Sequence, residues 1–526
     1  MGNSGNNNLN TGLIFFFISI ICLTFQTVLF RELLSLFNGS EYIISFYWFI
    51  WFSANIAGCI SGLKFRFSEK KFVYLCFIYL LVCIASLIFI KYSGIFFVSG
   101  NTEINIIKCL IIVVISIIIP CFINSFIFCC LLNSNEKTHT VTSLYIKETA
   151  GFIIAGLLTY FSVNYIIDFY LFSFLGVVIN FLLIIYIYLN SKKISLTGIL
   201  CFFISVFFIF SYNDFSNYLI RKIYPGFFLS EEINDEYGKH ILISSENEKC
   251  LMISGTPVLF QFEPGIDEEI IFSGTVQTKE KPVLLIDGIL FFPLMDKLKS
   301  VNTEEINVVF PSEKLYFSAL KTIDNSSELL LSQLKNVKIH FGSLQNYLTK
   351  SKKKFDFIII DIKNTALLQN AFYYYPETYA LIKSKLTETG IVSFLFPGES
   401  NYISRESELL KKSVISGMKK VFFDVNIFPL TYTIIMAGNN KIISDFEKMD
   451  KILDSKKIIK KYFNFVNIGL RLSNFSKINE YFVSGNYEYN TYRESTLGAI
   501  SNTQGTVGTD FTITSIAGNY FLDKSQ

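Results

Sequence analysis

The chain has 526 residues, of which 51% are hydrophobic and 56 are phenylalanine, and this composition excludes an ordinary soluble protein. The formal net charge is only +3, so the charge gives no reason to expect a nucleic-acid partner. Charge is also spread unevenly, because only 18 of the Asp, Glu, Lys and Arg residues lie among the first 212 positions. We therefore expect a transmembrane helical domain, residues 1–212, followed by a water-soluble part.

The first part contains seven apolar runs, each close to the roughly 20 residues that a helix needs to cross a bilayer. We interpret them as seven transmembrane helices. The polar, uncharged segment Met1–Asn10 in front of them lacks the basic start and small-residue cleavage site of a signal peptide. The runs are Gly12–Phe30, Tyr42–Leu63, Phe72–Ile90, Cys109–Leu132, Leu144–Val163, Phe169–Leu189 and Ile194–Tyr212.

The positively charged residues predict the orientation of these helices, because cytoplasmic connections carry an excess of Lys and Arg. The odd connections hold little more than Arg31 and Lys91. The even connections carry Lys64, Arg66, Lys70, Lys71, Lys137, Lys192 and Lys193. We therefore expect the N-terminus in the cytoplasm and, after an odd number of helices, the C-terminal domain on the outer side of an inner or cytoplasmic membrane.

A few charges lie in or beside the apolar runs, where charge is costly. They are Arg31-Glu32, Glu41 and Lys147-Glu148. They indicate either a polar cluster at a binding cavity or ion pairs that fix the packing of helices, and we favour ion pairs. The cysteines of this part, including Cys121, Cys129 and Cys130, are expected to pack as small apolar side chains.

Beyond residue 212 the pattern changes. A linker is expected over Asn213–Ser230, followed by short strands at Tyr237–Ile243, Lys249–Ser254 and Pro257–Gln261. Short apolar runs then alternate with helical patterns, which favours a parallel sheet covered on both faces. Its strands are expected at Pro282–Asp287, Ile306–Phe310, Val337–His340, Phe355–Asp361 and Gly390–Phe396, with a closing hairpin over Phe422–Ala437.

Several motifs resemble membrane-fused spermidine synthase-like proteins (polyamine aminopropyltransferases). The resemblance begins at Gln26–Glu41 and Tyr145–Gly156, and in the second motif the small residues Gly151, Ala155 and Gly156 would let a neighbouring helix approach closely. It continues through Phe355–Asp361, Asn370–Tyr379 and Thr389–Gly398. The resemblance implies a helical membrane bundle followed by an α/β Rossmann-like domain of the SAM-methyltransferase type. We divide the chain into the membrane domain (1–212), linker and small β lobe (213–280), Rossmann domain (281–440) and C-terminal extension (441–526).

The positions that would bind the adenosyl donor in such a family are altered here. After the first strand the chain keeps Asp287 and Gly288 but follows them with Ile289-Leu290 in place of a glycine-rich loop. The second strand ends in Phe310, where the resemblance implies an acid for the ribose hydroxyls. We regard Asp287, Gly288 and Phe310 as a degenerate cofactor-binding set.

The positions that would activate the amine are altered as well. Ile271-Phe272, after Asp267–Glu269, occupy the place of a Tyr-His pair. Two acids separated by two residues are implied after the fourth strand, but the chain has Asp361 and Asn364, and an amide cannot act as a base. The aromatic run Phe372–Pro376 indicates either a cleft lining or a helix start packed on the sheet.

These changes predict a membrane protein that lacks aminopropyltransferase activity, binds no cofactor, and acts as a binding or assembly module. Its partners would be the lipid bilayer and other membrane or envelope proteins, with no nucleic acid. The alternative is an active aminopropyl- or methyl-transferase that uses decarboxylated S-adenosylmethionine or S-adenosylmethionine. A transporter or channel is a third hypothesis.

The orientation can be tested with a reporter enzyme that works only in the cytoplasm, fused after Gln526. We expect no reporter activity at this position, because an odd number of helices separates it from the N-terminus. The same reporter fused within the basic connection after the second helix should be active. Strong activity at Gln526 would contradict the predicted orientation.

Overall fold

The computed structural model describes residues 8–37, 41–65, 69–98, 106–133, 141–162, 168–191, 195–235, 238–261, 265–323, 336–362, 372–398, 405–461 and 475–484. Contacts within the chain divide it into two compact units, and the division falls between Ile241 and Leu242. The first unit holds seven long helices and the second a large mixed sheet flanked by helices.

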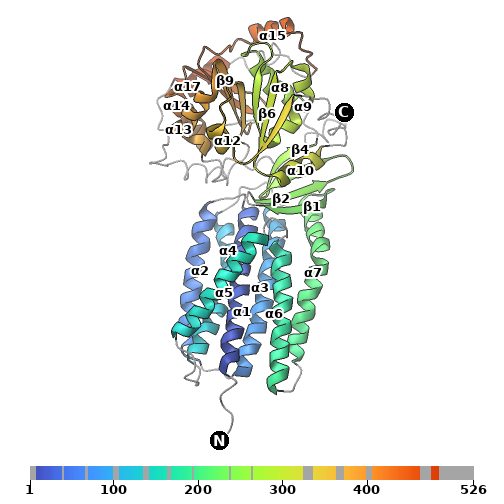
Figure 1. Cartoon of the computed structure of the whole chain (residues 1–526), viewed down its shortest axis with the longest axis vertical. Helices are drawn as coiled ribbons and strands as arrows, with labels where there is room; N and C mark the ends of the chain where they lie inside the picture. The colour runs from blue at the N-terminus through green and yellow to red at the C-terminus, as the bar shows by residue number, and fades with distance from the viewer. Residues whose placement is uncertain are drawn as a thin grey trace. The chain divides into compact units, whose positions relative to one another are not determined.

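The seven long helices run alongside one another as a bundle (Figure 1). Within the described ranges, all seven are long and apolar enough to cross a membrane. A helix suits an apolar solvent because it satisfies its own backbone hydrogen bonds. They are α1 (Asn8–Leu36), α2 (Glu41–Gly62), α3 (Glu69–Val98), α4 (Ile106–Leu132), α5 (Val141–Ser162), α6 (Asp168–Ser191) and α7 (Leu196–Ile223).

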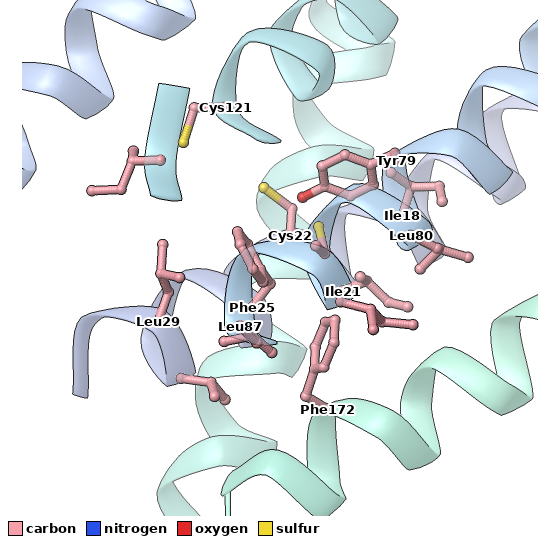
Figure 2. Close-up of a cluster of buried hydrophobic side chains, with 14 of the residues drawn as sticks. Ile18, Ile21, Cys22, Phe25, Leu29, Tyr79, Leu80, Leu87, Cys121 and Phe172 are labelled. Atoms are coloured by element: carbon pink, nitrogen blue, oxygen red, sulfur yellow. The ribbon is translucent and has the colours of Figure 1, made fainter. Parts of the chain in front are cut away.

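Helix α1 supplies much of the bundle core. Its side chains meet those of α3, α4 and α6 in one apolar cluster, which Figure 2 shows around Phe25, Tyr79, Cys121 and Phe172. The rings of Phe25 and Phe172 lie 5.8 Å apart, a distance typical of packed aromatic pairs. The ten cysteines are all free thiols, and Cys121, Cys129 and Cys130 are buried, which confirms that they pack as small side chains.

Small residues let pairs of helices approach closely. A Cβ added at Gly151 of α5 would lie 2.7 Å from the carbonyl oxygen of Phe16 in α1, so these two backbones are nearly in contact. Ala155 is also buried. The prediction for Gly156 is wrong, because nothing lies within 4 Å of a Cβ at that position. Gly156 is on the side of α5 that turns away from its neighbours.

Helix α7 corrects the predicted linker at 213–230. It continues through Asp214 to Ile223, because Tyr212, Ser216 and Leu219 are buried one helical turn apart, with Arg221 and Lys222 in the last turn. The helix begins where the Ser195 hydroxyl accepts a hydrogen bond from the Gly198 N–H. A further strand then follows where only linker was expected.

Four strands form a small sheet with the order β1-β2-β3-β4. The last three of them confirm the short strands predicted from sequence. The first was missed because its sequence has no alternation of apolar and polar residues. The strands are β1 (Phe228–Asp235), β2 (Gly238–Ser244), β3 (Lys249–Ile253) and β4 (Thr256–Phe260).

The second unit contains a seven-stranded sheet with the order β10-β11-β9-β8-β5-β6-β7. Neighbouring strands from β9 to β7 run parallel, whereas β11 runs antiparallel to both β9 and β10. The predicted parallel sheet with a closing hairpin is thus confirmed. The strands are β5 (Val283–Asp287), β6 (Glu305–Phe310), β7 (Val337–Phe341), β8 (Phe355–Asp361), β9 (Leu386–Phe396), β10 (Asp424–Pro429) and β11 (Thr433–Gly438).

Helices cover both faces of this sheet (Figure 1). One apolar cluster joins one face to α8 (Ile266–Thr275), α9 (Phe291–Ser300), α10 (Glu313–Thr322) and α15 (Phe446–Ser455). A second cluster joins the other face to α12 (Leu344–Lys350), α13 (Pro376–Lys385), α14 (Arg405–Lys419) and α17 (Phe475–Val483). Double coverage explains why the central strands are apolar throughout rather than alternating.

Two glycines of α5 provide a matched test of the bundle packing. We expect Gly151→Ala to lower the free energy of unfolding by about 1–3 kcal/mol, because the added methyl group would collide with α1. Gly156→Ala is the control and should be neutral or stabilising by about 0.5–1 kcal/mol, since it faces open space and alanine favours helix. Thermal unfolding of the purified protein in detergent measures both. Equal effects of the two substitutions would contradict the described packing of α5 on α1.

Candidate functional site

Two aspartates lie at the carboxyl ends of neighbouring central strands. Asp287 is the last residue of β5 and Asp361 the last of β8, and these parallel strands pair Ile286 with Ile359. The two acids therefore share one edge of the sheet, which is where open α/β sheets bind their ligands. The structure brings together here one residue predicted for the cofactor and one predicted for catalysis.

Tyr373 completes this group from the segment before α13. Its hydroxyl donates a hydrogen bond of 3.3 Å to Oδ2 of Asp287, and the backbone N–H of Asp361 also bonds the Asp287 side chain. Sequence reasoning did not assign Tyr373 a role, although the aromatic run Phe372–Pro376 marked its position. Its separation from Asp287 by 86 residues hides the contact in the sequence.

The pKa of Asp287 is raised to about 7, first because the carboxyl group is buried and second because the negative charge of Asp361 is close. The hydrogen bonds from Tyr373 and from the Asp361 N–H oppose this rise. Burial, followed by the charge of Asp287, also raises the pKa of Tyr373. Near neutral pH the group can hold or release one proton, and its acids favour a cationic ligand.

The turn after β5 packs tightly on the end of β6. Gly288 has a φ of +30°, and a Cβ there would lie 3.3 Å from the carbonyl oxygen of Val309. Glycine therefore fits this close approach better than residues with a side chain. The chain continues as a short 3-10 helix (Gly288–Leu290), in which Leu290 is buried, and not as an open glycine-rich loop.

Phe310, the last residue of β6, lies in an aromatic cluster. Its ring lies 5.5 Å from that of Phe292 and 5.1 Å from that of Tyr316, and its side chain is fully buried. Phe272 and Leu290 belong to the same apolar cluster, and Ile289 packs against it. This cluster is large, and the positions of these side chains relative to a bound donor stay a prediction. Asn364 lies outside the described residues.

Two of the acids before Phe272, Glu268 and Glu269, have structural roles. Glu268 is fully buried and bonds Lys297 of α9, and its carboxylate also accepts the backbone N–H of Lys461 at 2.9 Å. Glu269 accepts hydrogen bonds of 2.9 Å and 2.8 Å from the N–H and hydroxyl of Thr431, in the turn between β10 and β11. These acids connect α8 to the rest of the unit.

No group of three or more His, Cys, Asp or Glu side chains in the described ranges could hold a metal ion. The groups described at the carboxyl edge are instead of two kinds. At the ends of β5 and β8 lie two acids and the phenol of Tyr373, and the end of β6 carries packed aromatic rings. The first kind suits a cation or a proton, and the second offers no hydrogen bonds to a sugar.

Comparison with solved structures gives partial likenesses at low identity. A spermidine synthase from Thermotoga maritima is 13% identical, with a TM-score of 0.39, over 49% of this chain and 87% of that chain. A spermidine synthase in complex with the transition-state analogue AdoDATO is 14% identical, with a TM-score of 0.41, over 49% and 88%. Human methyltransferase-like protein 13 in complex with SAH is 15% identical, with a TM-score of 0.29, over 39% and 99%. No protein-family model and no curated protein sequence matches the chain.

The raised pKa of Asp287 predicts a pH dependence of stability. An aspartate in an unfolded chain ionises near pH 4, so between about pH 4 and about pH 7 the folded protein keeps a proton that the unfolded chain has released. The free energy of unfolding should therefore fall as the pH rises through this window. Asp287→Asn removes the ionisation, so its stability relative to the wild type should increase between about pH 4 and about pH 7 and stay constant above.

Thermal unfolding of both proteins across this pH range measures the effect. Glu388→Gln is the control, because Glu388 is exposed on β9, and its curve should run parallel to that of the wild type. A difference between Asp287→Asn and the wild type that stays constant with pH would contradict the assignment.

Proposed function

We propose that the chain is an integral membrane protein whose α/β unit has a transferase-type fold, lacks aminopropyl transfer, and acts as a binding or assembly module. The observation that carries this proposal is the buried Phe310 at the end of β6. A donor nucleoside would need hydrogen bonds for its ribose at this corner, and the ring packs there against Phe292 and Tyr316 instead. Ile289 and Leu290 extend the same apolar surface.

The cost of this arrangement to a nucleoside is large. A hydroxyl group that is buried without a hydrogen-bond partner costs roughly 1–3 kcal/mol, and about 1.4 kcal/mol changes affinity tenfold. A ribose has two such hydroxyls, so binding would weaken by orders of magnitude. The short 3-10 turn after Gly288 also offers less exposed backbone to a ligand than an open glycine loop.

The membrane part of the proposal rests on the side chains that the helices expose. In α7 five large apolar side chains are more than half exposed, and in α2 and α5 similar rows occur. Exposing such apolar surfaces to water is unfavourable, whereas lipid tails can cover them without this cost. The α7 row is Leu196, Leu200, Phe203, Phe207 and Phe210. We propose that lipid covers these rows, that the α/β unit lies on the outer side, and that it binds another membrane or envelope protein.

A second candidate function is favoured by the acidic group at β5 and β8. The contacts among Asp287, Asp361 and Tyr373 support this candidate, because such a group could hold a cationic amine and accept its proton. This alternative is an aminopropyl- or methyl-transferase with an unusual donor pocket. The two candidates differ in whether an adenosyl donor binds.

Calorimetry with S-adenosylmethionine and with its decarboxylated form separates the candidates. We expect no saturable binding of either donor to the purified protein at concentrations up to about 1 mM, which corresponds to a binding free energy weaker than about −4 kcal/mol. Saturable binding in the micromolar range would contradict the proposal and support the second candidate. Thermal unfolding of the same sample confirms that the protein is folded.

Placing an acid at position 364 tests the amine-activating position separately from the donor-binding positions. We expect Asn364→Asp to show no aminopropyl transfer, because the apolar corner at Phe310 would still exclude the donor. Transfer is measured as conversion of a diamine in the presence of the decarboxylated donor. Turnover by this single variant would show that the donor pocket is open.

A further inference from the structure

A second group of buried charges lies in the first unit. Glu32 of α1, Lys91 of α3, Glu232 of β1 and Lys239 of β2 have side chains between 5% and 13% exposed. Tyr212 of α7 is buried beside them. Two positive and two negative charges therefore balance within one desolvated cluster.

Lys239 is the central cation of this cluster. Its Nζ lies 2.8 Å from a carboxylate oxygen of Glu32 and 2.8 Å from one of Glu232. Lys91 is farther from both acids, at 3.7 Å and 4.0 Å. Lys91 instead donates a hydrogen bond of 2.6 Å to the hydroxyl of Tyr212, and that hydroxyl donates to Glu232 at 2.7 Å.

The walls of the cluster are aromatic and fixed by packing. The ring of Tyr212 stacks on Phe169 at 4.2 Å and meets Tyr170 edge-on at 5.1 Å. The Tyr212 ring faces the second cation, because Nζ of Lys91 lies 4.5 Å from its centroid. The two carboxylates are the groups that recognise an ammonium ion in a desolvated site. Burial alone would lower the pKa of Lys239, but Glu232 and Glu32 raise it above its ordinary value, so the amine stays protonated.

We propose that the carboxylates of Glu32 and Glu232, the second of which is held by the Tyr212 hydroxyl, form a binding site for a primary ammonium group, which the chain fills with its own Lys239. The side chain of Lys239 is then an internal ligand that attaches the start of β2 to α1 through Glu32 and to β1 through Glu232. Arg31 supports the same attachment, because its guanidinium donates a hydrogen bond of 2.9 Å to the carbonyl oxygen of Asp235. A soluble ammonium ion and Lys239 exclude each other from the site.

The proposal is tested by removing the internal ligand and supplying it again in solution. Lys239→Ala deletes Cγ, Cδ, Cε and Nζ, and propylammonium has the same heavy atoms. In thermal unfolding of the full chain in detergent, we expect Lys239→Ala to lower the midpoint by several degrees. Millimolar propylammonium should restore at least half of this loss in a saturable manner, and 1-propanol, which is uncharged, should restore none.

Two controls define the site. Lys249→Ala removes a half-buried lysine that bonds the carbonyl oxygen of Lys321, and propylammonium should not change its midpoint. In the double variant Glu232→Gln with Lys239→Ala, rescue should be lost, because one of the two acids is gone. A wild-type midpoint for Lys239→Ala, a loss without saturable rescue, or equal rescue by propanol would each overturn the proposal.

If Lys239→Ala does not fold, a pair of variants of similar length replaces it. Lys239→Arg keeps a cation between Glu32 and Glu232, whereas Lys239→Met keeps the length without the charge. The amount of monodisperse protein recovered by size-exclusion chromatography should be higher for Lys239→Arg by at least threefold. Equal recovery of the two variants would overturn the proposal.

Discussion

A charge that leaves water is costly unless an opposite charge lies beside it, and this constraint connects the elements of the helical unit. Glu32 and Lys91 lie on helices whose other buried side chains are mostly apolar. Their partners come from β1 and β2, about 200 residues after Glu32 and about 140 after Lys91. Each of these charged side chains has its partner on another element, so α1, α3, β1 and β2 must pack together for the charges to be neutralised.

Burying charge is also costly at the carboxyl edge of the large sheet, but there a proton, and not an opposite charge, removes the cost. Asp287 and Asp361 have like charges on neighbouring strands, and a proton held by Asp287 relieves the repulsion. One strand away, Phe310 ends β6 among aromatic rings and needs no polar partner. The edge therefore combines an acidic part with an apolar part. The acidic part suits a cation and the apolar part disfavours a sugar, which is why the two candidate functions differ in the ligand and not in the fold.

Much of the fold could be predicted from local pattern. Apolar runs of the length of a bilayer mark α1 to α7, and five-residue apolar runs between helical patterns mark the parallel strands. The pattern failed where long-range contacts decide the structure. A linker was expected after Tyr212, yet α7 continues because Ser216 and Leu219 are buried. Strand β1 holds the buried Glu232 side chain, which Lys91, Lys239 and the Tyr212 hydroxyl stabilise.

In the candidate site, too, some residues could be predicted from sequence and others only from the structure. Asp287, Gly288, Phe310 and Asp361 could be chosen from sequence because each ends or follows a predicted strand, and strand ends of a parallel sheet share one edge. The role of Tyr373 could not, because its hydroxyl reaches Asp287 only after α13 has packed on the sheet. Sequence by itself determined which segments are apolar, which alternate, and where strands end, since these depend on neighbours in the chain. Tertiary structure alone decided which glycine of α5 meets α1, which acid at the sheet edge has a raised pKa and which lysine neutralises Glu32, because those depend on distances between segments far apart in sequence.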